Sequence, residues 1–389
     1  MAFLLDNFEF VLFALTLVGV ALFHRHTMWV ALAGMTAILL YKLIFNDPSN
    51  PFNLFEHLTH EARTLINLLG LLLGFAILAK HFEDSKIPDV LPNYLKSGWA
   101  GAFSLLVMIC VLSSFLDNIA AAMIGGTIAL VVFRGKVHIG YIAAIVAASN
   151  AGGAGSVIGD TTTTLMWIDG VPAFNVLHAY VAVIPALLLF GIVTSIQQTR
   201  YQPIMNDAAP GIRIEWIKIV VVLLILVGAI VTNMLLDFPA AGVWAGILIG
   251  TLLTKTPWEE IKNSIKGSIF LMALVFSASM MPVQNLPEAS WKSSFVLGFV
   301  SAVFDNIPLT KLALVQGGYD WGMLAYAVGF GGSMIWFGSS AGVAITNKFP
   351  EARSVGKWLK YGWSVALAYI IGFFVLLSIM GWEPVVGYK

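Results

Sequence analysis

Long apolar runs separated by short polar connections dominate the chain from one end to the other. The runs cover 8–23, 28–45, 65–79, 98–116, 119–133, 139–148, 174–196, 217–236, 240–253, 268–283, 293–304, 307–315, 321–335, 341–345 and 358–380. Some approach the ~20 residues that a helix needs to cross a bilayer, whereas others are too short to cross it alone. The pattern predicts an all-α polytopic membrane protein whose outer surface contacts membrane lipid.

A polar stretch divides these runs into two sets. Residues 197–215 contain four charged residues and two prolines, and apolar runs resume directly afterwards. We therefore expect a first membrane repeat at 1–196, a cytoplasmic linker at 197–215 and a second membrane repeat at 216–389.

Two motifs of the first half recur in the same order in the second half. Segment 113–119, SSFLDNI, recurs as SAVFDNI at 301–307, and each copy interrupts an apolar run. The glycine-rich segment 152–161 recurs at 331–340, again between equivalent apolar runs. We interpret the chain as an internal duplication.

The Lys and Arg residues predict how the two repeats are oriented. Each repeat fits five crossings, one re-entrant hairpin at its Asp-Asn-Ile motif and one helix broken at its glycine-rich segment. With that topology the 21 Lys and Arg residues divide sixteen to five, and the richer side is assigned to the cytoplasm, which puts both termini outside. Five crossings invert the second repeat relative to the first. Inverted repeats with broken helices are typical of secondary transporters.

Composition excludes several other classes of protein. Hydrophobic residues make up 59% of the chain and charged residues 11%, whereas soluble domains have roughly 45–50% and about 25%. The 21 basic residues balance 21 acidic ones, so no nucleic-acid partner is expected. The single cysteine, Cys110, can form neither a disulfide framework nor a thiolate metal cluster. Recognisable catalytic motifs are lacking, so we expect a protein that is not an enzyme and needs no cofactor.

Three carboxylates interrupt the apolar or glycine-rich membrane runs: Asp117, Asp160 and Asp305. A carboxylate at the bilayer centre costs about 2.5–3.5 kcal/mol on the lenient scales, so it persists where it faces a cavity or a partner. Asp and Asn are also common N-caps, and these residues could simply satisfy the free amides of the following half-helix. Ion binding and helix capping both remain open for them.

The stretch 150–164, NAGGAGSVIGDTTTT, is unlike a continuous lipid-facing helix. Its glycines permit an unwound backbone whose carbonyls can face a cavity, and Asn150, Asp160 and the threonine hydroxyls add further oxygen ligands for a hard cation. Close packing of helices through small residues is the alternative interpretation of the glycines. In the second copy Ser339 stands at the position of Asp160, so the site should be chemically asymmetric.

Taken together, these motifs resemble those of the NhaD-type sodium/proton antiporters, members of the ion transporter superfamily. The segments that carry the resemblance are LDNI at 116–119, NAGG at 150–153, IGDTTT at 158–163 and WFGSSAG at 336–342. The resemblance implies exchange of Na⁺ or Li⁺ for H⁺ across a plasma membrane, here the bacterial inner membrane. Polar positions that match those implicated in transport are Asp117, Asn118, Asn150, Asp160, Thr162, Thr163, Ser301 and Asn306, and Ser339 and Ser340 fit the hydroxyl-rich second break.

Our hypothesis is that protons and Na⁺ or Li⁺ compete for one set of carboxylates. The cation would bind Asp117, Asn118, Asn150 and Asp160, with Thr162 and Thr163 assisting. Asp305 and Asn306 would complete the side of the site that the second repeat provides.

Two other transport functions remain open. The superfamily also contains carriers of dicarboxylates, citrate and arsenite, so a Na⁺- or H⁺-coupled anion transporter is the main alternative. The residues favour a cation, because a polycarboxylate would face three buried acids without an arginine clamp. A channel is a third class, and the duplicated broken helices argue against it. Amphipathic segments at 51–61 and 257–265 could support contact with a second copy, so a homodimer is a possible assembly.

Overall fold

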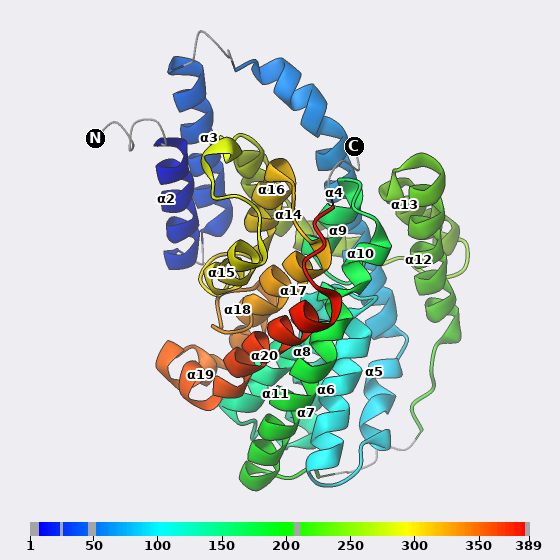
Figure 1. Ribbon diagram of the computed structural model, residues 1–389. Helices are drawn as coiled ribbons and strands as arrows, with labels where there is room; N and C mark the ends of the chain where they lie inside the picture. The colour runs from blue at the N-terminus through cyan, green and yellow to red at the C-terminus, as the bar shows by residue number, and fades with distance from the viewer. Residues whose placement is uncertain (1–7, 24–25, 46–51, 206–210, 386–389) are drawn as a thin grey trace.

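The computed structural model describes residues 8–23, 26–45, 52–205 and 211–385. Within these ranges the secondary structure is helical and contains no strand (Figure 1). Six helical segments are long and apolar enough to cross a membrane: α3 (Thr27–Ile44), α4 (Leu54–Asp84), Ala173–Tyr201, α12 (Trp216–Leu236), α14 (Glu259–Ser279) and α20 (Trp363–Met380). The prediction of an all-α polytopic membrane protein is thereby confirmed.

The remaining helices are shorter, apart from α11, which makes up most of the segment Ala173–Tyr201. Five of them are apolar: α2 (Phe8–Leu22), α6 (Trp99–Ser113), α7 (Asn118–Val132), α8 (Ile139–Ala154) and α13 (Pro239–Thr251). The others are α5 (Ile87–Val90), α9 (Thr161–Ile168), α10 (Ala173–Leu177), α11 (Ala179–Tyr201), α15 (Trp291–Ser301), α16 (Asn306–Gln316), α17 (Trp321–Gly331), α18 (Ser340–Lys348), α19 (Val355–Tyr361) and the 3₁₀ turns 91–94, 283–285 and 350–352.

The helices form two groups, which we call the peripheral and the central bundle. In the peripheral bundle α12 packs on α13, both pack on α4, and α14 packs on α3 and α4, with α2 outside α3. The central bundle consists of α6–α9, α11 and α15–α20, in which α11 packs on α6, α8 and α20. The two bundles meet through α14 with α16 and through α4 with α9. Figure 1 shows α12 and α13 at one edge and the central helices in the middle.

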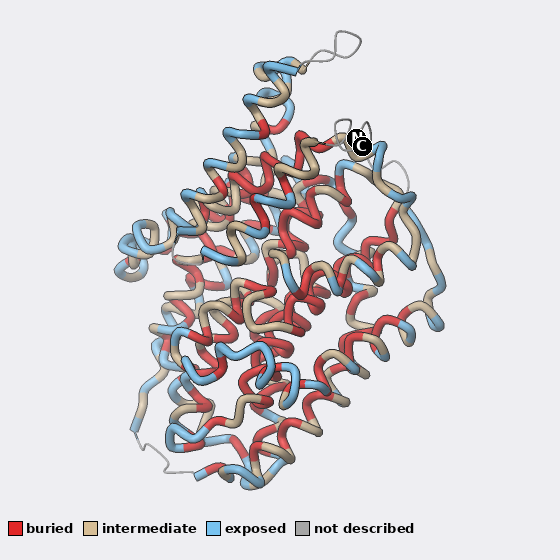
Figure 2. Tube along the Cα trace, turned by 90° about the vertical axis from the view of Figure 1, so that its left-hand side faces the viewer, coloured by how far each residue is buried: buried red, intermediate tan, exposed pale blue. Residues whose placement is uncertain are grey.

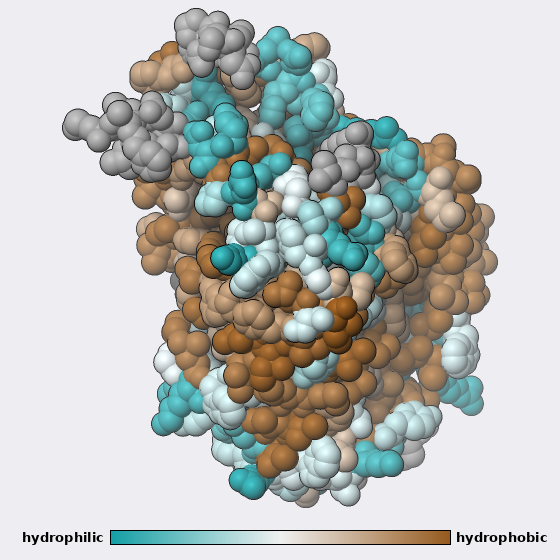
Figure 3. Space-filling model, in the orientation of Figure 1, coloured by the Kyte–Doolittle hydropathy of each residue, from teal (hydrophilic) through white to brown (hydrophobic). Residues whose placement is uncertain are grey.

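The interior of the central bundle is built from α8 and α17. Nearly every residue of both helices is buried, and the two helices pack against each other. Figure 2 shows the buried residues gathered in the middle of the molecule. On the outside of the molecule, in contrast, large apolar side chains are exposed. Met234 on α12 is 78% exposed and Leu252, directly after α13, is 84% exposed. Such apolar surface is suited to lipid, and Figure 3 shows apolar residues over the sides of the molecule with hydrophilic ones gathered at its upper and lower ends.

Two expectations from the sequence concern segments that the described residues cover only in part. Helix α11 ends at Tyr201, inside the segment 197–215 that was expected to be a linker, and residues 206–210 of that segment lie outside the described ranges. The expected position of the two termini concerns residues 1–7 and 386–389, which also lie outside the described ranges.

Candidate functional site

Four helices of the central bundle are N-capped by a residue that the sequence singled out. Asp117 caps α7 and accepts from the Ile119 amide at 3.1 Å, and Asp305 caps α16 and accepts from the Ile307 amide at 3.0 Å. In the same way Asp160 caps α9 and Ser339 caps α18, accepting from the amides of Thr162 at 3.4 Å and Gly342 at 3.2 Å. Capping is therefore real at all four positions. Each carboxylate nevertheless has a second oxygen that a cap does not use.

Asp160 is the meeting point of the two halves of the chain. Its side chain is 1% exposed, and Asn118 donates to Oδ1 at 3.2 Å while Asn306 donates to Oδ2 at 3.5 Å. Asn118 and Asn306 occupy the same position in the duplicated Asp-Asn-Ile motif. One carboxylate thus receives the equivalent amide from each half, although 146 residues separate Asp160 from Asn306.

Asn150 extends this network towards α17. Its Oδ1 accepts from Asn118 at 3.1 Å, and its Nδ2 donates to the Ser333 hydroxyl at 2.9 Å. Asn150 and Ser333 are fully buried. Ser333 was not among the residues predicted from the sequence. The difference between the two copies could have revealed it, because Ser333 stands where the first copy has Ala154.

Two of the candidate hydroxyl residues, Thr163 and Ser301, hold the backbone, and Thr162 does not. Thr163 donates to backbone oxygens of Ser156 and Asp160, and Ser301 donates to the backbone oxygen of Val328 at 2.7 Å. The Thr162 hydroxyl is buried and has no hydrogen-bond partner among the described residues. It is an oxygen close to the Asp160 cap that a ligand could use.

In the second half, both carboxylate oxygens of Asp305 accept a hydrogen bond. Ser340 donates to Asp305 Oδ2 at 3.3 Å while the other oxygen of Asp305 caps α16. The Ser339 hydroxyl serves the cap of α18. The structure therefore joins Asn118, Asn150, Asp160 and Asn306 in one network, and joins Asp305 and Ser340 in another.

The glycines of the first break serve close packing as well as unwinding. A Cβ on Gly152 would lie 1.9 Å from the Cys110 backbone oxygen, and one on Gly159 would lie 2.0 Å from the Ser113 oxygen. The helix itself is interrupted between Ala154, the last residue of α8, and Thr161, the first of α9. Close packing therefore applies both inside α8, at Gly152, and within the interruption, at Gly159, and binding of an ion by the unwound backbone stays a prediction.

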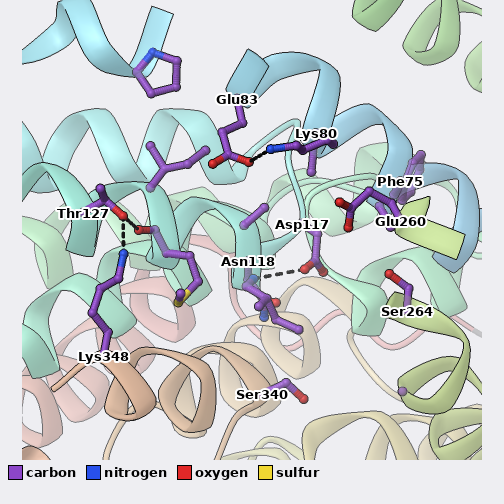
Figure 4. Close-up of a pocket in the computed structure, with 18 of the residues that line it drawn as sticks. Phe75, Lys80, Glu83, Asp117, Asn118, Thr127, Glu260, Ser264, Ser340 and Lys348 are labelled. Atoms are coloured by element: carbon purple, nitrogen blue, oxygen red, sulfur yellow. Dashed lines mark hydrogen bonds and ion pairs between the residues drawn. The ribbon is translucent and has the colours of Figure 1, made fainter. Parts of the chain in front are cut away.

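A cavity of about 740 Å³ leads to this site from one side of the molecule. Asp117, Asn118, Thr161, Asn306 and Ser340 line its inner end. Figure 4 shows Asp117 and Asn118 pointing into the middle of this pocket. Asp160 is not among the residues that line the cavity, so it lies behind Asn118 rather than on the cavity wall.

The outer part of the cavity contains both signs of charge. Lys80 pairs with Glu83 at 3.0 Å, and Lys348 donates to Thr127 (Figure 4). Asp89 and Glu260 also line the cavity. The lining residues thus carry four carboxylates, Glu83, Asp89, Asp117 and Glu260, against two lysines, and this excess of negative charge is attractive to a cation.

Three buried charges outside this site were not predicted from the sequence. Lys311 on α16 is 2% exposed and lies 2.9 Å from Glu61 and 4.0 Å from Asp169. The predicted topology counts Lys311 among the five basic residues of the outer side, and the structure places it inside α16 rather than in a connection. Its position within the apolar run 307–315 was the available signal.

A class of protein follows from comparison with known families. The chain belongs to the citrate transporter family CitMHS, whose model matches residues 10–331. It is therefore an integral membrane transporter and not an enzyme, as the sequence predicted. The expected absence of a cofactor fits a transporter whose ligands are its transported ions.

Several individual relatives of the chain have the names of sodium/proton antiporters. The chain is 25% identical over 330 residues to Sodium/proton antiporter 1 of Arabidopsis thaliana, an alignment that covers 73% of this chain and 54% of that protein, so the chain spans about half the length of this relative. It is 23% identical over 373 residues to Sodium/proton antiporter 2 of the same plant, covering 84% of this chain and 85% of the relative. It is 24% identical over 386 residues to the Na(+)/H(+) antiporter NhaD of Halomonas elongata, covering 82% and 77%. The resemblance to NhaD-type antiporters is confirmed.

Proposed function

We propose that the protein is a secondary antiporter that exchanges Na⁺ or Li⁺ for H⁺ at a carboxylate site near the middle of the membrane. The observation that carries this proposal is the arrangement around Asp160, where a buried carboxylate receives one asparagine from each half of the chain directly behind a cavity. Protons and small cations both bind carboxylate oxygens, so one set of oxygens can hold either ligand but not both.

In this proposal the cation binds Asp117, Asn118, Asn150 and Asp160. Asp117 receives the ion from the cavity, and Asp160 holds it on the inner side. Asn118 would turn its amide so that Oδ1 faces the ion, because the amide offers a donor at one end and an acceptor at the other. Asn118 is close enough to take part in this site, because its Nδ2 donates to Asp160 at 3.2 Å.

The other polar residues have supporting roles in the proposal. Thr162 offers an oxygen that has no hydrogen-bond partner in the described structure. Asp305, Asn306, Ser339 and Ser340 form the side of the site that belongs to the second half. Thr163 and Ser301 keep the unwound backbone in place through their bonds to carbonyl oxygens.

We further propose that the chain consists of two inverted repeats, 1–196 and 216–389, joined by a cytoplasmic linker at 197–215. Helices α6–α7 and α15–α16 would be the re-entrant hairpins, and α8–α9 and α17–α18 the broken helices. Each repeat would contribute five crossings, with both termini outside the bacterial inner membrane. The cavity lined by Lys80 and Lys348 would then open to the cytoplasm. A homodimer is part of the same proposal.

A second candidate is a Na⁺- or H⁺-coupled anion transporter, with citrate, a dicarboxylate or arsenite as substrate. The family match and the cavity volume of about 740 Å³ favour it. The cavity, however, is lined by four carboxylates, Glu83, Asp89, Asp117 and Glu260, and by only two lysines, of which Lys80 is paired with Glu83. A polycarboxylate would meet repulsion where it needs paired cations.

Proton release from vesicles separates these candidates. In inside-out vesicles with an acidic interior, added Na⁺ or Li⁺ should release protons, and Asp117→Asn or Asp160→Asn should abolish the release. Asp237→Asn is the matched control, because Asp237 follows α12 far along the chain from the motifs and has a positive φ of 49° that Asn also tolerates. Exchange that survives both site substitutions would overturn the proposal. Uptake of labelled citrate driven by Na⁺, without cation-driven proton release, would instead support the second candidate.

A further inference from the structure

A buried ion pair between Glu61 and Lys311 joins two helices that flank the ion site. Glu61 lies on α4 and Lys311 on α16, and Lys311 Nζ is 2.9 Å from Glu61 Oε2. Helix α9, which Asp160 caps, packs on both α4 and α16. The ion pair lies near the other end of α9, because Asp169, directly after its last residue, is 4.0 Å from Lys311. The pair therefore holds α16 on α4 beside the end of α9 that is remote from Asp160.

Both members of this pair are buried, and neither lines the cavity. The Lys311 side chain is 2% exposed and the Glu61 side chain 7% exposed. The part of α4 that lines the cavity begins at Leu72, and the part of α16 that lines it is Asn306. An ionisable group in the interior of a membrane protein is costly, so its presence indicates a function. Because the pair is outside the cavity wall, a function in transport has to act through other residues.

Helices α9 and α16 bring two residues of the ion site together at their N-terminal ends. Asp160 caps α9, and Asn306 is the first residue of α16. Asn306 donates to Asp160 Oδ2 at 3.5 Å. Lys311 follows Asn306 by five residues, which is about 7.5 Å along the helix axis. The position of Asn306 relative to Asp160 thus depends on where Lys311 holds α16.

The contact from Asn306 fixes the orientation of the Asp160 carboxylate. Oδ1 of this carboxylate accepts from the Thr162 amide at 3.4 Å, and Oδ2 accepts from Asn306. A carboxylate that is held at both oxygens cannot rotate freely about its bond to Cβ. A ligand group that is already oriented loses less entropy when it binds an ion. A shift of α16 along α9 would release Oδ2 and so weaken binding of the ion.

We propose that Lys311 is a positioning residue for transport, and that its ion pair with Glu61 holds α16 in the register at which Asn306 reaches Asp160. This inference rests on the proposed antiport function, which supplies the ion that Asp160 binds. When the ion pair is removed, α16 loses its charged contact with α4. Asn306 then no longer holds Asp160, because its contact of 3.5 Å leaves no room for a longer one. The ion binds more weakly, while the steps that follow binding are unchanged.

Removal of both charges tests this proposal. Lys311→Met alone would leave Glu61 as a buried charge without its partner, which is strongly destabilising, whereas loss of both members of a buried pair is often tolerated. The test variant is therefore Glu61→Gln/Lys311→Met, which we call the neutral pair. Its half-saturating Na⁺ concentration for proton release from vesicles should rise about fivefold, as expected for one lost hydrogen bond. Its maximal rate should stay the same. An unchanged or lower half-saturating concentration overturns the proposal.

Combination with Asn306→Ala shows whether Lys311 acts through Asn306. Substitutions at independent sites multiply their effects on a binding constant. If the ion pair acts by placing Asn306, the neutral pair combined with Asn306→Ala should have the same half-saturating Na⁺ concentration as Asn306→Ala alone. A general weakening of the structure would instead multiply the two effects or lower the maximal rate. Either of these results overturns the proposal.

Lys42→Met is the matched control for loss of a lysine from an interhelical ion pair. Lys42 Nζ on α3 lies 3.7 Å from Glu9 Oε1 on α2, in the peripheral bundle. Its substitution should leave the half-saturating Na⁺ concentration unchanged. A rise equal to that of the neutral pair would show that loss of any such ion pair weakens binding, and would overturn the proposal.

Thermal unfolding in detergent shows whether the neutral pair is folded. If it is not, Glu61→Asp replaces it as the test variant, since it keeps both charges and shortens one side chain by a methylene group. Its half-saturating Na⁺ concentration should rise about twofold, which is the low end for one weakened hydrogen bond, and should not rise in the Asn306→Ala background. No rise in Glu61→Asp, or a rise that persists with Asn306→Ala, overturns the proposal.

The same assay separates this inference from the proposed function. If the unmodified protein shows no proton release driven by Na⁺ or Li⁺, the antiport function fails. If that protein takes up labelled citrate with Na⁺ instead, the half-saturating Na⁺ concentration for this uptake is compared among the same variants, and the same criteria decide the role of Lys311. If exchange is normal and the effects of the neutral pair and Asn306→Ala multiply, only the positioning role fails.

Discussion

The two glycine-rich breaks perform the same structural task with different residues. Asp160 caps α9 and Ser339 caps α18, and both side chains are buried. Ser339 has one oxygen, which accepts from the Gly342 amide. Asp160 has two oxygens, and the one that the Thr162 amide does not use accepts from Asn306. Since a serine is sufficient for the cap, capping alone does not account for an aspartate in the first break.

The two hairpin tips differ in a related way. Asp117 lines the cavity, whereas Asp305 accepts from Ser340 through the oxygen that its cap leaves over. The asparagines that follow them, Asn118 and Asn306, both reach Asp160 instead of serving one break each. A chain with a duplicated set of motifs thus concentrates its polar contacts on a single carboxylate. Substitutions at the two breaks and the two tips can test whether that asymmetry is what makes exchange possible.

The largest effect is expected when the first break is made like the second. Asp160→Ser should abolish Na⁺-driven proton release, because the carboxylate is lost, but should leave the protein folded, because Ser and Asp cap helices about equally well. Size-exclusion chromatography and thermal unfolding provide the control for folding. Asp160→Ser protein that exchanges at the normal rate would show that the difference between the breaks is irrelevant to transport.

A smaller effect is expected from removing the two asparagine amides. Asn118 bonds to both Asn150 and Asp160, whereas Asn306 makes one long contact of 3.5 Å. In the proposed function the Asn118 amide oxygen binds the ion, and a polar contact with a charged group contributes about 1.5–3 kcal/mol. Asn118→Ala removes this ligand and should therefore raise the half-saturating Na⁺ concentration about tenfold or more.

Asn306→Ala should raise that concentration less, because the bond that it removes is longer. Rates of proton release measured over a range of Na⁺ concentrations give both values. Equal effects of the two substitutions would mean that the halves contribute equally, which contradicts the asymmetric site.

How much of this site the sequence could predict depends on whether a contact is local. The caps at Asp117, Asp160 and Asp305 were predictable, because a cap involves residues two or three positions apart, and all three aspartates are caps. That Asn306 contacts Asp160 was not predictable, since it depends on how α16 packs against α9. Nor was the pairing of Lys311 with Glu61, because an isolated lysine in a short apolar run resembles a loop charge until α4 is placed beside it. The apolar pattern, in contrast, predicted the all-α membrane fold, since helix length and lipid contact follow directly from it.

The two breaks differ in their polar side chains, but we expect close backbone packing at a glycine in both of them. A Cβ on Gly152 would lie 1.9 Å from the Cys110 oxygen, and one on Gly331 would lie 2.3 Å from the Gly298 oxygen. Both substitutions to Ala force backbone apart and should destabilise by roughly 1–3 kcal/mol, with Gly152→Ala the larger effect. Thermal unfolding in detergent measures both.

Gly356→Ala is the matched control for these two substitutions. Gly356 lies in α19 with no neighbouring atom within 4 Å of an added Cβ, so Ala should be tolerated or slightly stabilising there. If Gly152→Ala were as stable as Gly356→Ala, close backbone approach would not explain the glycine in the first break.

The smallest effect is expected from the hydroxyl that supports the second hairpin. Ser340 donates to Asp305 at 3.3 Å, while Thr161, at the equivalent position in the first half, donates to Asp160 at 3.4 Å. A single hydrogen bond from a partly exposed hydroxyl contributes about 0.5 kcal/mol at the low end, so Ser340→Ala should raise the half-saturating Na⁺ concentration only about twofold. Thr161→Val should have the larger effect of the two, because its bond ends on the carboxylate that both asparagines contact. The same proton-release assay measures both values. A larger effect of Ser340→Ala than of Thr161→Val would mean that Asp305, and not Asp160, is the more important carboxylate for Na⁺ binding.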